Sequence, residues 1–145
     1  MLSLLQRVSE ASVSVEGRCV GRIGPGILAL LAVQPDDTPA RAERLVERLL
    51  GYRVFADADG RMNRSLREID GGLLLVPQFT LAADTRKGTR PSFTTAAPPA
   101  LGRELFEHAL AHARACWPQT ESGVFGADMA VALVNDGPVT FWLDA

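Results

Sequence analysis

Two short, unbroken apolar segments constrain the fold of this chain more than any other feature. Ile27–Val33 and Leu73–Val76 contain only apolar residues, and a glycine stands directly before each of them. Apolar runs of this length, bounded by turn residues, are typical of strands that are buried on both faces. A membrane-spanning helix would need about 18 apolar residues in a row. The sequence therefore predicts a sheet with strands that are covered on both sides, and no membrane span.

Apolar stripes at helical spacing predict two main helices. The first covers about residues 38–50, because Thr38 can cap it, Pro39 suits its first position and Gly51 stops it. The second covers about residues 99–116, where a Pro-Pro pair precedes a run of apolar residues at helical spacing. We therefore expect helices in addition to the buried strands.

Further strands are indicated by shorter patterns. Leu2–Val15 alternates between apolar and polar residues but changes phase near Ser9–Ala11, which predicts a strand with a bend or bulge. Other expected strands are Cys19–Ile23, Arg53–Phe55, Met129–Val134 and Val139–Leu143. Short strands, two helices and no repeated βαβ spacing favour an α+β fold with a strongly curled, barrel-like mixed or antiparallel sheet. Residues 1–145 are expected to form a single domain.

Composition limits the classes of partner. The 145 residues include 15 Lys+Arg and 17 Asp+Glu, for a net charge of −2. This balance argues against a broad nucleic-acid-binding face but allows a small basic patch. Cys19 and Cys116 are too few for a disulfide framework, and no cysteine spacing indicates a zinc site. Without the pattern of a signal peptide, the chain is expected to be cytoplasmic, and we expect neither a cofactor nor a metal.

The sequence has no familiar nucleophile or phosphate-binding signature, and its histidines do not replace one. His108, His112 and Cys116 recur every four residues on the second predicted helix. The first and the last are about 12 Å apart along the helix axis, too far for one ion with bonds of about 2.0–2.3 Å to reach all three. We interpret these residues as a solvated or partly packed helix face. The same geometry disfavours a Cys/His hydrolase that uses Cys116.

Three segments remain as candidates for function. Gln78-Phe79-Thr80 follows a buried strand, where functional side chains and ordinary strand ends both occur; Thr80 is a weak nucleophile because no base is near in sequence. Arg86, Lys87 and Arg90 belong to a long loop over residues 84–98 and suit one or two phosphates, although a solvated loop has the same composition. Asn135-Asp136-Gly137-Pro138 is expected to be a hairpin turn, or a segment that recognises a ligand through its backbone.

Motifs in order from Met1 to Asp144 resemble the D-aminoacyl-tRNA deacylase family. They are Gln6-Arg7-Val8, Gly21-Arg22-Ile23-Gly24, Met62-Asn63, Gln78-Phe79-Thr80-Leu81, Ala83-Asp84, Lys87-Gly88, Arg90-Pro91-Ser92-Phe93, Phe125-Gly126-Ala127-Asp128-Met129 and Asn135-Asp136-Gly137-Pro138-Val139-Thr140. The resemblance implies a homodimeric hydrolase that edits the 3′ end of tRNA. Its substrates would be esters of D-amino acids, and of glycine mischarged on tRNA(Ala), with no DNA or membrane partner.

The resemblance also implies roles for individual residues. Gln78, Phe79 and Thr80 would line the catalytic pocket, and Phe125 would belong to the substrate-binding set. Gly137-Pro138, joined by a cis bond and fixed by Arg7, would enter the pocket of the other subunit and reject L-amino acids by a steric clash. The basic residues Arg86, Lys87 and Arg90 would contact tRNA.

A mechanism without a protein nucleophile follows from the same resemblance. The 2′-hydroxyl of the terminal adenosine would activate water, while backbone N–H groups around Phe79 and Thr80 stabilise the oxyanion. One residue departs from the family pattern: Pro77 stands where Ser is usual, so a hydroxyl and a backbone N–H are both missing. Two alternatives stay open, a related tRNA deacylase with relaxed chirality and a non-catalytic nucleic-acid-binding module.

Overall fold

The long first strand, β1 (Leu2–Val15), organises the sheet. In the computed structural model, which describes residues 1–145, one edge of β1 pairs antiparallel with β3 (Gly26–Ala32) and then with β2 (Arg18–Ile23). Its other edge pairs antiparallel with β8 (Ala130–Asp144), and the register shifts between Val8 and Glu10. The predicted irregularity in this strand is therefore confirmed, and it lies where β1 leaves β3 and begins to pair with β2.

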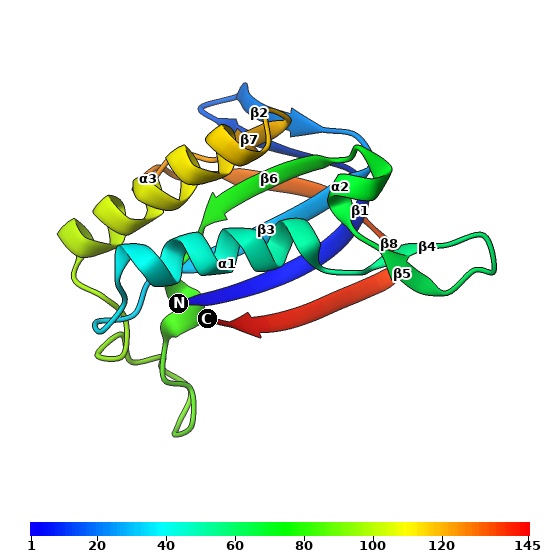
Figure 1. The fold of residues 1–145 in the computed structure, drawn as a ribbon. Helices are drawn as coiled ribbons and strands as arrows, with labels where there is room; N and C mark the ends of the chain where they lie inside the picture. The colour runs from blue at the N-terminus through cyan, green and yellow to red at the C-terminus, as the bar shows by residue number, and fades with distance from the viewer.

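Two parallel pairs extend the sheet and curl it. Strand β3 pairs with β6 (Gly72–Pro77), and β6 pairs with β7 (Thr120–Ser122). Strands β7 and β2 approach each other closely, because a Cβ atom added to Gly21 would lie 2.8 Å from the carbonyl oxygen of Ser122. The mixed sheet is thus a nearly closed barrel, as predicted, and the chain termini lie side by side (Figure 1).

Helices α1 (Pro39–Gly51) and α3 (Pro99–Cys116) lie next to each other on one face of the sheet (Figure 1). The Thr38 hydroxyl caps α1 by accepting a hydrogen bond from the Arg41 N–H at 3.3 Å, which confirms the predicted start. In β3, Ile27, Ala29 and Leu31 belong to the core under the helices, whereas Leu28 belongs to a separate core on the opposite face. The predicted burial of this strand on both faces is confirmed.

Several short elements differ from the prediction. The strand expected at Arg53–Phe55 is β4 (Phe55–Ala56), which pairs with β5 (Met62–Arg64) in a hairpin that projects from the molecule (Figure 1). Helix α2 (Leu66–Ile69), β5 and β7 have no counterpart in the prediction. Soon after β6 ends, residues Phe79–Ala82 form a short 3-10 helix, η1, and do not continue the strand.

The prediction of two closing strands joined by a hairpin turn is wrong. Strand β8 runs without reversal from Ala130 to Asp144 and stays antiparallel to β1 throughout. Asn135 and Thr140 both pair with β1, and the residues between them stand opposite only Arg7. Asp136–Val139 therefore form a bulge in one strand.

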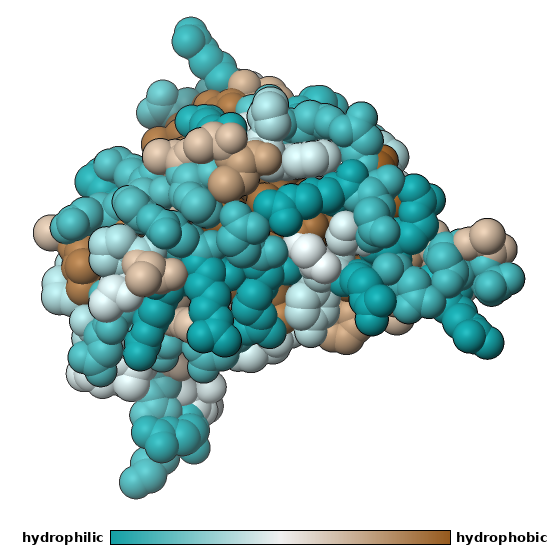
Figure 2. Space-filling model, in the orientation of Figure 1, coloured by the Kyte–Doolittle hydropathy of each residue, from teal (hydrophilic) through white to brown (hydrophobic).

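The helical face of the molecule is largely hydrophilic (Figure 2). None of the helices combines the length and the apolarity needed to cross a bilayer.

Candidate active site

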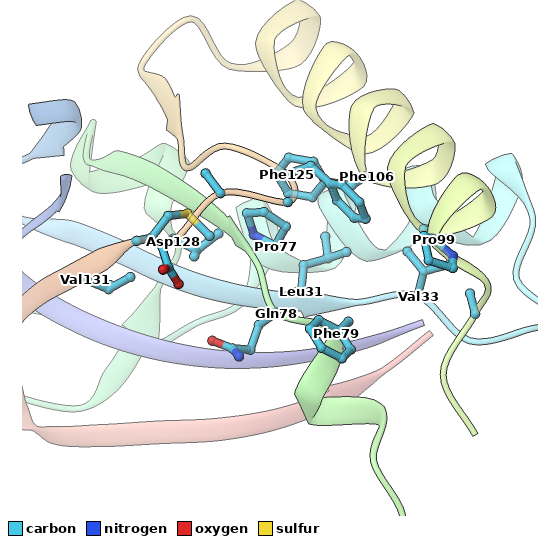
Figure 3. Close-up of a pocket in the computed structure, with 16 residues that line it drawn as sticks. Leu31, Val33, Pro77, Gln78, Phe79, Pro99, Phe106, Phe125, Asp128 and Val131 are labelled. Carbon is cyan, nitrogen blue, oxygen red and sulfur yellow. The ribbon is translucent and has the colours of Figure 1, made fainter. Parts of the chain in front are cut away.

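A large cavity opens where β6 ends, between the sheet and the first turns of α3. Its volume is about 720 Å³, and most of the lining is apolar. Figure 3 shows Leu31 on β3 and Val33 just after it, Pro77, Gln78 and Phe79 at the end of β6, and Pro99 and Phe106 on α3. Asp128 is the one lining residue with an ionisable side chain, and the lining has no His, Cys or Lys. A cavity of this kind can hold and orient a ligand, but it offers few groups for proton transfer.

Gln78 and Phe79 line one end of this cavity, whereas Thr80, which was expected there as well, is exposed and is not among the lining residues. The Gln78 N–H donates to the Leu31 carbonyl at 2.8 Å, which fixes the end of β6 against β3. The Phe79 ring lines the cavity while 57% exposed, and it packs on Phe93 with ring centroids 5.2 Å apart. The side-chain amide of Gln78 donates to the Thr80 hydroxyl. Because an amide cannot remove a proton, this contact does not make Thr80 a nucleophile.

Pro77 is buried in the wall of the cavity. The backbone nitrogen of the next residue faces β3, so the Pro77 nitrogen faces the other edge of β6. The pairing of β6 with β7 ends before this point, at Leu75. Pro77 therefore removes no hydrogen bond from the sheet, and the strand tolerates it at this position.

The far wall of the cavity comes from a turn that packs on α3. Phe125, in the segment before β8, lies beside Phe106 with ring centroids 6.4 Å apart (Figure 3). The guanidinium carbon of Arg103 lies 4.9 Å from the centre of the Phe125 ring. A Cβ atom added to Gly102 would lie 3.3 Å from this ring, so the glycine leaves room for it. Phe125 thus lines the same cavity as Gln78 and Phe79.

The three basic residues lie outside this cavity, in a loop closed by hydrogen bonds between Asp84 and Ser92. The loop surrounds a separate hollow of about 400 Å³ lined by Asp84, Arg86, Lys87, Arg90 and Ser92. Arg86 donates to both carboxylate oxygens of Asp84, at 2.9 and 2.7 Å. These hydrogen bonds hold the pKa of Asp84 far below its usual range, so the pair stays ionised. Lys87 and Arg90 have no such acidic partner.

Gly137 and Pro138 are exposed and do not line the cavity of their own chain. The peptide bond between them is cis, and Gly137 has a φ angle of +130°. The Asn135 side chain closes the bulge, because its oxygen accepts from the Val139 N–H at 3.1 Å and its nitrogen donates to Thr140 at 2.9 Å. The fold therefore presents these two residues outward, away from their own cavity.

Arg7, on the neighbouring strand β1, supports this bulge through hydrogen bonds. Its Nε donates to the Asp136 carbonyl at 3.1 Å, and its Nη1 donates to the Val54 carbonyl at 2.7 Å. A Cβ atom added to Gly137 would lie 3.0 Å from the Arg7 Nη2. The expected proximity of Arg7 to Gly137 and Pro138 is thus present in the structure.

His112 and Cys116 lie in the last turns of α3, away from the cavity at its start, and His108 lies in the middle of the helix. Burial raises the pKa of the Cys116 thiol, whereas an activated nucleophile needs a lowered pKa. Cys116 is therefore poorly suited to the Cys/His hydrolase considered above. What sequence reasoning missed here is Glu47 of α1, which lies within contact distance of both His112 and Cys116.

Sequence reasoning also gave no individual role to Pro99, Phe106 and Asp128, which line the cavity. Asp128 belongs to a motif quoted for the family resemblance, which was the one available signal. Pro99 and Phe106 look like ordinary residues of an amphipathic helix. Their contribution arises only because α3 begins above the end of β6 (Figure 3).

Comparisons with known proteins agree with the motifs. The family model described as D-Tyr-tRNA(Tyr) deacylase matches residues 4–144. A D-aminoacyl-tRNA deacylase of Thioalkalivibrio sulfidiphilus (strain HL-EbGR7) is 65% identical over 144 residues, which cover 99% of this chain and 97% of that protein. A D-aminoacyl-tRNA deacylase of Pseudomonas entomophila (strain L48) is 63% identical over 143 residues, with 99% of both chains covered.

Two solved structures share the fold. One is described as the c-Myc DNA Unwinding Element Binding Protein; it is 36% identical, with a TM-score of 0.95, and the match covers 100% of this chain and 99% of that one. The other is described as a probable eukaryotic D-amino acid tRNA deacylase and has a TM-score of 0.86 at 20% identity, over 99% of this chain and 98% of that one. At that identity the second match shows the fold alone. The sequence matches, together with the cavity and the fold, show that this chain belongs to the D-aminoacyl-tRNA deacylase family of hydrolases.

Proposed function

We propose that this chain hydrolyses D-aminoacyl-tRNA in a cavity that one copy forms and a second copy completes. The substrate is the ester that joins a D-amino acid, or glycine on tRNA(Ala), to the 3′ end of tRNA, and the reaction takes place in the cytoplasm. The observation that carries the proposal is the cavity beside Gln78, Phe79 and Phe125, in a chain 65% identical to a D-aminoacyl-tRNA deacylase. Its apolar walls suit the aminoacyl group, and its open side leaves room for the terminal adenosine.

The reaction needs positioning more than it needs a protein base. Water attacks the ester carbonyl carbon, the bond from this carbon to the ribose 3′ oxygen breaks, and that oxygen takes up a proton. Because the lining has no His, Cys or Lys, we assign activation of the water to the 2′-hydroxyl of the terminal adenosine. The N–H groups of Phe79 and Thr80 begin η1, where an N–H has no partner within the helix, and they stabilise the oxyanion.

A second copy of the chain supplies the selection against L-amino acids. Gly137 and Pro138 are exposed and lie outside the cavity of their own chain, so they can act only on another molecule. Their strand, β8, also exposes large apolar side chains, among them Val134, Phe141 and Trp142, which is typical of an interaction surface. In the homodimer, Gly137 and Pro138 enter the partner cavity and leave no space for the side chain of an L-amino acid.

The loop beside the cavity provides the contact with tRNA phosphates. Lys87 and Arg90 are exposed and free of acidic partners, while Arg86 is neutralised by Asp84. Two available cations per chain give a weak, salt-sensitive contact that carries little information about the tRNA sequence. Recognition therefore concentrates on the aminoacyl end, which all tRNAs share.

A paired time course tests this function directly. Matched tRNA(Tyr) samples charged with D-Tyr or with L-Tyr are incubated with the protein, and the remaining ester is measured. We expect rapid loss of the D-ester and a rate for the L-ester close to that without protein. Equal rates for both would support the related deacylase with relaxed chirality and overturn the proposed selection.

A non-catalytic nucleic-acid-binding module is the second candidate. It is favoured by the 36% identical structure, which is described as a protein that binds a DNA unwinding element. The cavity and the net charge of −2 do not favour it, because binding to a DNA duplex calls for an extended basic face. Tight binding to duplex DNA, without turnover of either ester, would establish this module in place of the deacylase.

A further inference from the structure

We propose that Glu47, His112 and Cys116 form a binding site for one Zn²⁺ ion, which links α1 to α3. Glu47 lies in the second half of α1, and the other two residues lie in the last turns of α3. None of them lines the cavity at the start of α3. The site is therefore separate from the proposed chemistry and does not depend on it.

The three donor atoms have the spacing of three corners of a tetrahedron around zinc. Glu47 Oε1 lies 3.3 Å from His112 Nε2 and 3.5 Å from Cys116 Sγ, and His112 Nε2 lies 3.5 Å from Cys116 Sγ. Zinc bonds of about 2.0–2.3 Å at tetrahedral angles place N and O about 3.3 Å apart, and S about 3.5 Å from either atom. One ion can thus reach all three donors without any movement of the helices.

A neighbouring pair shows what the same contact looks like as a plain hydrogen bond. One turn earlier on both helices, His108 Nε2 lies 2.8 Å from Glu43 Oε1. No cysteine accompanies that pair, and its distance is normal for a hydrogen bond between N and O. The His112–Glu47 contact is longer, at 3.3 Å, in the one place where a thiol is also present. The donors at Glu47, His112 and Cys116 therefore have the spacing of tetrahedral zinc ligands, whereas the His108–Glu43 pair is closer than that spacing.

The surroundings fit zinc better than a hard cation. A thiolate and an imidazole are soft to intermediate ligands, which Ca²⁺ and Mg²⁺ do not select. The second carboxylate oxygen of Glu47 accepts a hydrogen bond from Arg67 Nη2 at 2.8 Å, so Oε1 stays directed toward His112 and Cys116. Support of a ligand by a second residue is usual at zinc sites. With three protein ligands, the fourth position is left to water.

Binding of Co²⁺ to the reduced full-length protein tests the site, because Co²⁺ replaces zinc and reports its ligands by absorption. We expect one Co²⁺ per chain, a near-ultraviolet band from thiolate bonding, and the intense visible bands of four-coordinate Co²⁺. Zn²⁺ should displace the bands. Cys116→Ser should abolish the near-ultraviolet band, and His112→Gln and Glu47→Gln should abolish stoichiometric binding. Arg67→Met should weaken binding about 10- to 100-fold.

His108→Gln and Cys19→Ser are the matched controls, because one removes the neighbouring histidine and the other removes the only other thiol. Both should bind Co²⁺ as the unmodified chain does. Circular dichroism establishes that each variant is folded. The proposal is overturned if the unmodified chain shows no thiolate band at saturating Co²⁺. It is equally overturned if the band survives in Cys116→Ser or disappears in Cys19→Ser.

Discussion

The cavity and the Gly137–Pro138 bulge differ in how the chain holds them. The cavity wall is continuous with the core, since Val76 and Phe106 are almost completely buried. The bulge is exposed, and side-chain hydrogen bonds from Arg7 and Asn135 support it. A wall built from the core keeps its shape without a partner, whereas an outward bulge can act only on something outside its own chain. Substitutions in the wall should therefore change the rate, and substitutions in the bulge should change the choice of substrate.

Filling the cavity should have the largest effect. Gly102→Trp places a large ring against Phe125, because even a Cβ atom at this position lies 3.3 Å from Phe125. We expect hydrolysis of D-Tyr-tRNA to fall by at least about 100-fold, since small displacements of a bound ester already cost that much. Gly51→Ala is the control, because it has open space around it and lies away from the cavity. An unchanged rate for Gly102→Trp would place the reaction elsewhere.

Displacing the bulge should alter selectivity more than rate. An alanine at position 137 would have its Cβ 2.8 Å from Val139 Cγ2 and 3.0 Å from Arg7 Nη2, at a φ angle that favours glycine. We expect Gly137→Ala to reduce the ratio of D-Tyr-tRNA to L-Tyr-tRNA hydrolysis about 10-fold or more, the range of steric discrimination by one carbon atom. Gly17→Ala provides the control, since it has a positive φ angle but no neighbour within 4 Å. A ratio that stays at its original value would show that the bulge does not select.

Weakening the hydrogen bonds that support the bulge should also lower the D-to-L ratio of hydrolysis rates, but by less than Gly137→Ala does. Arg7→Lys keeps the charge but cannot donate to Val54 and Asp136 together, because lysine lacks the forked guanidinium. A lost hydrogen bond of about 1 kcal/mol corresponds to about a fivefold change in the ratio. The D-to-L ratio of hydrolysis rates measures it. A larger effect than that of Gly137→Ala would mean that Arg7 acts on the substrate itself.

The Thr80 hydroxyl should matter little if the cavity only positions the ester. Thr80→Ala removes the acceptor of the Gln78 amide, so we expect the rate for D-Tyr-tRNA to fall about fivefold through looser packing of Gln78. Thr80→Ser restores the hydroxyl and should restore the rate. A folded Thr80→Ala protein without activity would instead identify Thr80 as a nucleophile.

Pro77→Ser should have the smallest effect. Pro77 costs the sheet no hydrogen bond, because the pairing with β7 ends at Leu75. We therefore expect the family's usual serine to leave both the midpoint of thermal unfolding and the deacylation rate close to those of the unmodified chain. A marked rise in rate would show that the serine hydroxyl or N–H contacts the ester in relatives.

Local patterns predicted the elements that are set by neighbouring residues. Thr38, Pro39 and the apolar stripe after them define α1 without help from the rest of the chain. The helix α2 also carried a local signal that was missed, the capping box of Ser65 and Glu68. The same local reasoning was wrong for Asn135–Pro138, since their turn residues form a bulge within one strand that pairs with β1 on both sides of it.

Long-range contacts account for what could not be predicted. The short strand β7 is defined by its position beside β6 and by nothing periodic in its own three residues. The cavity joins the end of β6, the start of α3 and the turn at Phe125, which are far apart in the sequence. Glu47 escaped notice for the same reason, because spacing along α3 alone pairs His112 only with its own helix.

Mixed dimers test most directly whether the cavity and the bulge belong to different copies. Chains carrying Gly102→Trp and Gly137→Ala are given different affinity tags, expressed together, and purified through both tags. The Gly102→Trp chain has a blocked cavity but an intact bulge, and the Gly137→Ala chain has the reverse. We expect the mixed dimer to hydrolyse D-Tyr-tRNA in its one open cavity with the D-to-L ratio of the unmodified protein. If the mixed dimer instead shows the low D-to-L ratio of the Gly137→Ala protein, each bulge acts on the cavity of its own chain, and the proposed exchange between copies is wrong.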